Sequence, residues 1–315
     1  MSEELAAHGC PLLLLLVSAA ISAELIARFG SDEQKQQWLP ALGAGEKMAF
    51  AITEPDAGSN THRLSTTAVR EGDTYRLRGT KTYISGVDES AAVLVVARTG
   101  TDDATGDARL SMFIVDSDAA GLDRTLIPVE IKAPEKQFQL FFDDVQVPSD
   151  RLLGEEHEGL RQVFSGLNPE RITGAAICTG LGRYALGRAS EYARERTVWD
   201  VPIGRHQGVA HPLAIAKIEL ELARLMVAKA AWLHDQDADP AAAGEAANMA
   251  KYAAAEAGLH CLDAAIQTHG GNGMASEYGL ADLWGLLRLL RIAPVSREMV
   301  LNFVAQQSLG LPKSY

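Results

Sequence analysis

The chain has 315 residues, of which 47% are hydrophobic and 22% charged, and these proportions exclude an intrinsically disordered protein. Its formal net charge of −12 argues against binding along a nucleic-acid backbone, which needs a basic surface. Three widely spaced cysteines and eight scattered histidines predict no metal site and no disulfide framework, and they favour a reducing compartment, here the cytoplasm.

The first region has a helical pattern, which runs from about Leu12 to Leu42. Its leucine-rich stretch 11–20 lacks the basic residues that precede a signal-peptide core and is too short to span a bilayer. We therefore predict a buried helix there and no membrane span. Phe29-Gly30 predicts a helix end, and Ser31-Asp32-Glu33-Gln34 predicts a capping box that opens the next helix. We assign residues 1–46 to part of an N-terminal helical domain.

The middle region, residues 47–152, changes to short β-rich runs separated by turn signals such as Glu71-Gly72-Asp73. The predicted strands are Thr74 to Leu77, Ala92 to Ala97, Leu110 to Val115 and Gln137 to Val147. The polar stretch Gly100 to Asp107 predicts an exposed hairpin tip. A run of antiparallel strands implies a sandwich or a barrel, and we assign a β-barrel domain.

The last region, residues 153–315, is helical again and rich in alanine and leucine. Asp239-Pro240 predicts a helix start, with an N-cap followed by proline at the first helical position. Long amphipathic helices of this kind predict a C-terminal helical bundle. The predicted fold class is therefore α+β, in the order helical, β, helical.

Five segments along the chain carry candidate chemistry. The first, Phe50 to Asn60, is a strand that runs into a Pro/Gly turn, and such a turn exposes backbone donors and small hydroxyls, although many turns do so. The others are Lys81 to Gly86, Phe141 to Pro148, Arg196 to Gln207 and Gln267 to Gly273. In this order and spacing the five segments resemble the motifs of acyl-CoA dehydrogenases, over nearly the whole chain.

The resemblance implies FAD bound between the β domain and the bundle, usually across a subunit interface. It assigns flavin contacts to Ile52 and Thr53, stacking to Tyr83, and a bond near the reactive N5 to Ser85. It places Arg196 of a neighbouring subunit at the FAD pyrophosphate, because arginine forks onto phosphate oxygens. The remaining cofactor-binding candidates in these motifs are Phe50, Gly58, Ser59, Trp199, Gln207, Gln267, Gly270 and Gly271.

The family's catalytic base removes the proton α to the thioester and is a carboxylate. Most members carry it near the C-terminus, where the ungapped register places Arg297 here, with Glu298 one residue further on. A minority carries it on an earlier helix immediately before an arginine, which matches Glu170 and Arg171. We therefore predict Glu170 as the base and Glu298 as the alternative. The competing interpretation is that Glu170 is an ordinary glutamate in the first turn of a helix that starts at Asn168-Pro169.

The resemblance implies an enzyme that desaturates a fatty or branched acyl-CoA and passes electrons to an electron-transfer flavoprotein, as a homodimer or homotetramer. Family members carry some tens of residues more at the N-terminus, so we describe this chain as an N-terminally shortened member. Two alternatives stay open: a catalytically silent subunit, and an oxygen-using flavoenzyme of the same fold.

Overall fold

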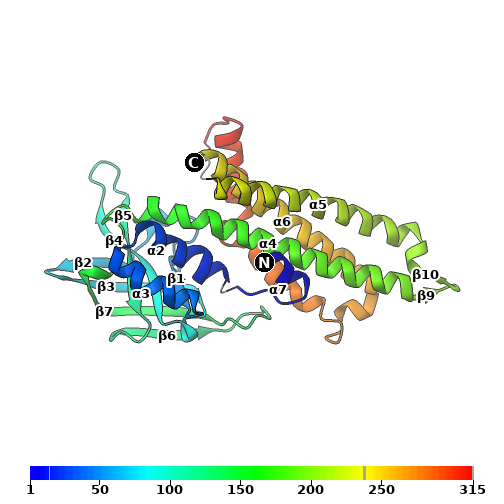
Figure 1. The fold of residues 1–315 in the computed structure, drawn as a ribbon, viewed down its shortest axis with the longest axis horizontal. Helices are drawn as coiled ribbons and strands as arrows, with labels where there is room; N and C mark the ends of the chain where they lie inside the picture. Colours follow the sequence, from blue (N-terminus) through cyan, green and yellow to red (C-terminus); the bar gives the residue numbers. More distant parts are fainter. Residues whose placement is uncertain (14, 237–238, 314–315) are drawn as a thin grey trace. The chain divides into compact units, whose positions relative to one another are not determined.

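A computed structural model describes residues 1–13, 15–236 and 239–313 of the chain (Figure 1). The chain divides into two compact units. The sheet unit comprises Leu13–Val129 and Pro134–Glu170, and the helical unit comprises Met1–Leu12, Glu130–Ala133 and Arg171–Tyr315.

The α-helices lie in two stretches of the chain, one on each side of the strand region. They are α1 (Ser2–Ala7), α2 (Glu24–Phe29), α3 (Asp32–Gly43), α4 (Gly159–Glu195), α5 (Gln207–Asp235), α6 (Pro240–His269), α7 (Trp284–Ile292) and α8 (Arg297–Phe303). The stretch predicted as a buried helix falls partly outside the described residues, and a π-helix over Leu15–Ala23 precedes α2. Within the described parts, none of the helices is long and apolar enough to cross a bilayer.

Eight strands form one sheet in the order β6-β7-β3-β2-β4-β5-β8, and β1 pairs with β4. They are β1 (Met48–Ala51), β2 (Thr67–Glu71), β3 (Thr74–Ser85), β4 (Ala92–Thr101), β5 (Ala108–Asp116), β6 (Leu122–Ile127), β7 (Gln137–Pro148) and β8 (Leu152–Leu153). The prediction of an antiparallel barrel is wrong in two respects. The end strands β6 and β8 do not pair with each other, so the sheet is open, and β1 runs parallel to β4.

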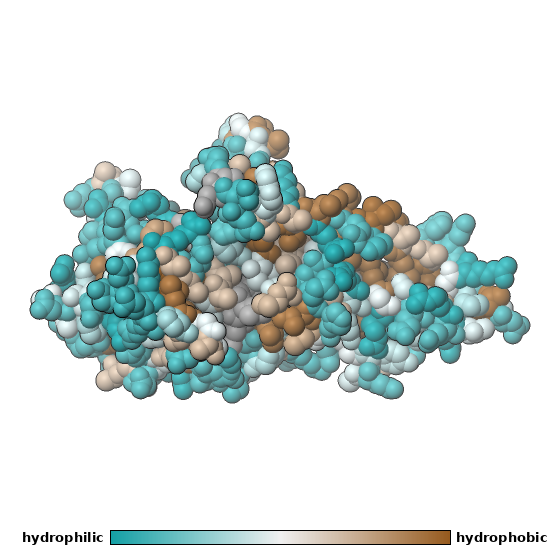
Figure 2. All heavy atoms as spheres, viewed as in Figure 1, coloured by the Kyte–Doolittle hydropathy of each residue, from teal (hydrophilic) through white to brown (hydrophobic). Residues whose placement is uncertain are grey.

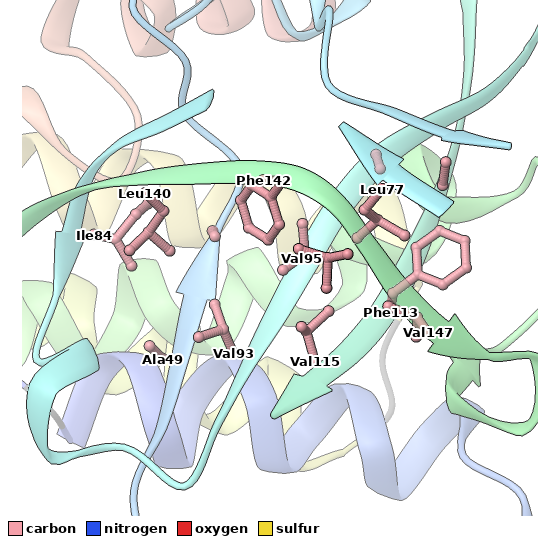
Figure 3. Close-up of a cluster of buried hydrophobic side chains, with 14 of the residues drawn as sticks. Ala49, Leu77, Ile84, Val93, Val95, Phe113, Val115, Leu140, Phe142 and Val147 are labelled. Carbon is pink, nitrogen blue, oxygen red and sulfur yellow. The ribbon is translucent and has the colours of Figure 1, made fainter. Parts of the chain in front are cut away.

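The sheet unit buries both faces of its central strand, β4. Successive side chains of a strand point to opposite faces, so Val93 and Val95 enter one core cluster while Leu94 and Val96 enter the other. Figure 3 shows the first cluster, in which Val93 and Val95 lie among side chains of β1, β3, β5 and β7. In the second cluster, side chains from helices, among them Leu25 of α2, pack against the opposite face.

Local sequence signals set the helix ends as predicted. The Ser31 hydroxyl accepts a hydrogen bond from the Gln34 N–H (3.2 Å), and the Gln34 side chain accepts one from the Ser31 N–H (3.1 Å), which completes the capping box. Asp239 caps α6 by accepting from the Ala242 N–H (3.2 Å), with Pro240 as the first helical residue. Both predictions are confirmed. Each cap involves only residues within one helical turn, so the local sequence is enough to recognise it.

The helical unit packs α4, α5 and α6 through small residues. A methyl group added at Gly182 of α4 would lie 2.9 Å from Leu220 of α5 and 3.4 Å from Cys261 of α6. At Gly258 of α6, a methyl group would lie 2.9 Å from the Cys178 carbonyl oxygen of α4, so the close approach of these two helix backbones depends on glycine. A short hairpin of β9 (Thr197–Val198) and β10 (Val201–Pro202) interrupts the helices between α4 and α5, where the sequence predicted helix alone.

Candidate flavin site

The first two motifs are joined beneath the surface by a buried ion pair. Lys81 of β3 is fully buried, and its ammonium lies 2.9 Å from Oε1 of Glu54, which is 3% exposed. The same ammonium donates to the Ile52 carbonyl oxygen (2.9 Å). The Glu54 carboxylate also accepts from the backbone N–H groups of Ser65 (2.7 Å) and Thr66 (2.9 Å). The pair therefore holds the end of β1 against β3 at the predicted flavin contacts.

Each partner of this ion pair changes the pKa of the other. Burial disfavours the Glu54 carboxylate, but the Lys81 ammonium and the donors from Ser65 and Thr66 outweigh burial and lower the pKa of Glu54 to about 2. Burial lowers the pKa of Lys81 to about 8, and the Glu54 carboxylate acts in the opposite direction. Both groups are therefore charged at neutral pH, which satisfies two charges that would be costly to bury alone.

Tyr83 lies beside this pair in an irregular part of β3. The Thr82 N–H donates to the Thr53 carbonyl oxygen (2.9 Å), so the chain at Thr53 contacts β3 next to Tyr83. The register between β3 and β7 shifts between Lys81 and Ile84, and Tyr83 has a φ of 57°. The Tyr83 side chain is 63% exposed as a result. Ile52, Thr53 and Tyr83, which the motifs predicted as flavin contacts, are therefore brought to one place.

Ser85 is held by a residue that the sequence analysis missed. Its hydroxyl exchanges hydrogen bonds with the side-chain amide of Gln137 on β7 (2.9 and 3.1 Å). Only the pairing of β3 with β7 shows this contact, because the two residues lie 52 positions apart in the chain. Phe50 packs half-buried against the core, whereas Gly58 and Ser59 are exposed on the turn after Glu54.

In the helical unit, the fourth motif forms the β9–β10 hairpin. The Arg196 N–H donates to the Tyr192 carbonyl oxygen, and the Ile203 N–H donates to the Arg196 carbonyl oxygen (both 2.8 Å). Trp199 and its neighbour Asp200 have positive φ angles at the tip, and the Trp199 side chain is 82% exposed. The Arg196 side chain is exposed, as is Gln207 at the start of α5.

The fifth motif forms the loop at the end of α6. Gly270 has a φ of 59° and a ψ of −132°, a conformation that side chains disfavour. A methyl group added at Gly270 or Gly271 would meet nothing within 4 Å, so a ligand can approach the backbone there. Gln267 is exposed one turn earlier. Each unit thus offers exposed groups that fit a flavin nucleotide: an aromatic ring in one, and an arginine with open glycine backbone in the other.

Comparison with known proteins identifies the family. Models of the N-terminal, middle and C-terminal domains of acyl-CoA dehydrogenases match residues 1–46, 49–145 and 157–309. The chain belongs to the acyl-CoA dehydrogenase family. The family predicted from the five motifs, with its enzyme class, is therefore confirmed.

Individual family members are similar over almost the whole chain. Acyl-CoA dehydrogenase FadE12 of Mycobacterium tuberculosis is 56% identical over 314 residues, which cover 99% of this chain and 80% of the relative. The structure of butyryl-CoA dehydrogenase from Megasphaera elsdenii is 28% identical with a TM-score of 0.91 and covers 98% of this chain and 80% of that chain. A glutaryl-CoA dehydrogenase from Mycobacterium smegmatis, solved in complex with FADH2, is 26% identical with a TM-score of 0.87 and covers 96% of this chain and 76% of that one. These neighbours confirm the predicted fold class.

The two acyl-CoA dehydrogenase base candidates have different surroundings. Glu170 is half-buried inside α4, followed by the buried Arg171. The competing interpretation of a first-turn glutamate is wrong, because α4 begins at Gly159 and the helix-terminus effect fades within one turn. Glu298 lies in the first turn of α8 with its side chain 73% exposed.

Arg297, at the position that the register gave to the usual base, takes part in a surface charge cluster. Its Nε lies 3.0 Å from Oε1 of Glu256, which also accepts from Nε of Arg291 (2.6 Å). Its guanidinium lies over the Tyr252 ring, 5.5 Å from the centroid. A cation held in this way cannot accept a proton, so of these two neighbouring residues only Glu298 could serve as the base.

Proposed function

We propose that this chain catalyses the FAD-dependent α,β-dehydrogenation of an acyl-CoA thioester, as in the first step of fatty acid β-oxidation. The observation that carries the proposal lies in the sheet unit, where the buried Glu54–Lys81 pair fixes Ile52 and Thr53 beside the exposed Tyr83 ring. FAD, when bound, supplies the hydride acceptor. The family, with an FADH2 complex among its solved structures, supports the choice of cofactor.

Glu170 is the proposed base, and it takes the proton from the carbon α to the thioester. Partial burial in the middle of α4 shields its carboxylate from water more than the surface position shields Glu298. A general base must take its proton inside a site that excludes water, which favours the carboxylate that is partly shielded. Arg171, the next residue in the chain, is proposed to have a structural role beside Glu170. As in the family, electrons would pass to an electron-transfer flavoprotein.

We further propose that the chain forms a homodimer or homotetramer through α5. Figure 2 shows hydrophobic residues gathered along this helix. Ile215, Ile218, Leu222, Leu225 and Trp232 are 51–68% exposed. Their spacing follows the a and d positions of a heptad repeat, which pack against a second helix. The first four of these residues are spaced by three, four and three positions, the same in both directions, so two antiparallel copies of this part of α5 match each other. Glutamate at Leu222 and Leu225 should shift the sedimentation coefficient to that of a smaller species, unlike glutamate at the exposed Val69.

Cys10, Cys178 and Cys261 are all free, and this absence of disulfides supports the proposed cytoplasmic location. Cys178 and Cys261 are buried, and burial raises the pKa of each thiol to about 12, so neither is a reactive thiolate.

The visible absorption spectrum of the FAD-loaded protein tests the proposed function. Anaerobic addition of acyl-CoA thioesters of different length and branching should bleach the flavin band for one class and so identify the substrate. Glu170→Gln should bind FAD, but its flavin band should bleach far more slowly. A protein that binds no FAD, or whose FAD no acyl-CoA bleaches, would contradict the proposal in favour of a silent subunit. Rapid reoxidation in air would favour the oxygen-using alternative.

A further inference from the structure

An aromatic cluster lies directly beneath the loop at the end of α6. The Tyr192 ring of α4 stacks on the buried His269 ring, with centroids 4.2 Å apart and an interplanar angle of 25°. Tyr278 meets both rings edge-on, at 6.1 Å from Tyr192 and 5.5 Å from His269. The Nδ1 atom of His269 lies 2.8 Å from the Ala265 carbonyl oxygen, which fixes the orientation of the imidazole in the last turn of α6.

Asn272 connects this cluster to the loop. Its side-chain amide donates to the hydroxyl oxygens of Tyr192 and Tyr278, each at 3.1 Å. Asn272 is itself exposed, so these bonds do not serve to satisfy a buried polar group. Instead, these bonds fix the position of the loop, because they tie its tip to two aromatic rings that are already packed against each other.

Each residue of the Gly270-Gly271-Asn272-Gly273 segment then has its own physical role. Gly270 allows the backbone angles that end α6, and Gly271 leaves the backbone open. A methyl group at Gly273 would lie 2.5 Å from the Ile266 carbonyl oxygen, so only glycine lets the loop fold back on the helix. Asn272 is the member of the segment whose side chain anchors it.

Tyr192 also links this loop to the hairpin that carries Arg196. Its carbonyl oxygen accepts the Arg196 N–H (2.8 Å), while its ring and hydroxyl hold His269 and Asn272. The two motifs of the helical unit lie some 70 residues apart in the sequence, yet one tyrosine contacts both. The last turn of α4 therefore carries Arg196 through its backbone and anchors the loop through the Tyr192 side chain.

We propose that Tyr192 and Tyr278 are positioning residues for cofactor binding: by holding Asn272 they fix the open backbone of Gly270 and Gly271, and Tyr192 keeps that backbone in register with Arg196. This inference rests on the proposed function, since it takes FAD as the ligand. Neither tyrosine is a catalytic residue. The role is to present preformed contacts, so that binding does not have to order the loop.

Titration of the apoprotein with FAD, followed by quenching of flavin fluorescence, tests the inference. Asn272→Ala removes both hydrogen bonds and should raise the Kd for FAD about tenfold, and Tyr192→Phe and Tyr278→Phe should each raise it a few-fold, because each retains its ring and loses one bond. Tyr184→Phe is the matched control: it also loses one hydroxyl partner, Arg188 (3.0 Å), on the same helix α4. It should leave the Kd unchanged.

The effects of double variants on the Kd for FAD distinguish a positioning role of the tyrosines from a general role in stability. In the Asn272→Ala background, Tyr192→Phe and Tyr278→Phe should raise the Kd no further, because their shared partner is already gone. Thermal denaturation of each apoprotein provides the second readout, and the Tm of the two Tyr→Phe variants should match that of Tyr184→Phe. Wild-type affinity in Asn272→Ala, or fully additive effects, would overturn the inference and leave the proposed function standing. Absence of FAD binding by the wild-type protein would overturn both.

Discussion

The two units hold their predicted cofactor contacts by different means. In the sheet unit, Ile52, Thr53 and Tyr83 are supported from below by the Glu54–Lys81 pair, whose two side chains are almost completely buried. In the helical unit, the Arg196 side chain and the Gly270–Gly271 backbone stand on exposed loops that are tied by surface hydrogen bonds. A motif that is supported by buried groups is held rigidly, but it tolerates few mutations. A motif on loops is easier to change and depends more on its neighbours.

The largest effect is expected on the rate of flavin reduction when the catalytic base is removed. The result also decides which unit carries the reactive carboxylate. Glu170→Gln should slow flavin reduction by acyl-CoA about 10³-fold, within the range lost with a general base. Glu298→Gln removes the alternative carboxylate from α8 and should leave the rate almost unchanged. Single-turnover stopped-flow absorbance checks both. The opposite ranking of the two variants would move the base to the helical unit.

Breaking the buried ion pair should have the next largest effect. Lys81→Met leaves the Glu54 carboxylate buried without its cation and should lower the free energy of unfolding by about 3–5 kcal/mol. Lys47→Met removes the lysine of the exposed Lys47–Glu89 pair and should cost less than about 1 kcal/mol. Urea denaturation of the two variants gives the comparison. Equal losses would show that burial does not distinguish the two pairs.

The same pair predicts how stability depends on pH. The pKa of Glu54 is about 2 in the folded protein and about 4.5 unfolded, so the unfolded state binds more protons between these values. Stability from this group is complete above about pH 4.5 and is lost as the pH falls towards 2, by about 3 kcal/mol. Urea midpoints measured from pH 6 to 3 should fall accordingly. Glu54→Gln has no carboxylate to protonate at this position, so its urea midpoint should fall less steeply as the pH decreases.

The smallest effects are expected in the loop of the helical unit. Gly270→Ala places a side chain at a φ of 59° and a ψ of −132°, and should cost about 1–3 kcal/mol of stability together with FAD affinity. Gly271→Ala has no positive φ and no atom within 4 Å of the new methyl group, so the apoprotein should keep its stability. A weaker FAD complex in Gly271→Ala, at unchanged Tm, would place the cofactor against this backbone. Denaturation and FAD titration together resolve the two cases.

Sequence signals that act within one turn predicted local structure well. The capping box at Ser31, the N-cap at Asp239 and the turn at Gly72 were read from adjacent residues, because each depends on backbone groups a few positions away. The family, too, followed from motifs that are contiguous in the chain. The sequence also placed β3, β4, β5 and β7, with shorter limits than the structure has, but it missed β2, β6 and β8.

Only the tertiary structure decided how the strands pair and what supports the site. The parallel pairing of β1 with β4 and the open edges of the sheet depend on register between distant strands, which no local pattern specifies. The partners of the motif residues are equally distant in the chain: Glu54 for Lys81, Gln137 for Ser85 and Tyr192 for Asn272. The sequence by itself thus determined the family, through the order and spacing of its motifs. Folding determined what holds them there, because burial and hydrogen bonding join groups that the chain keeps far apart.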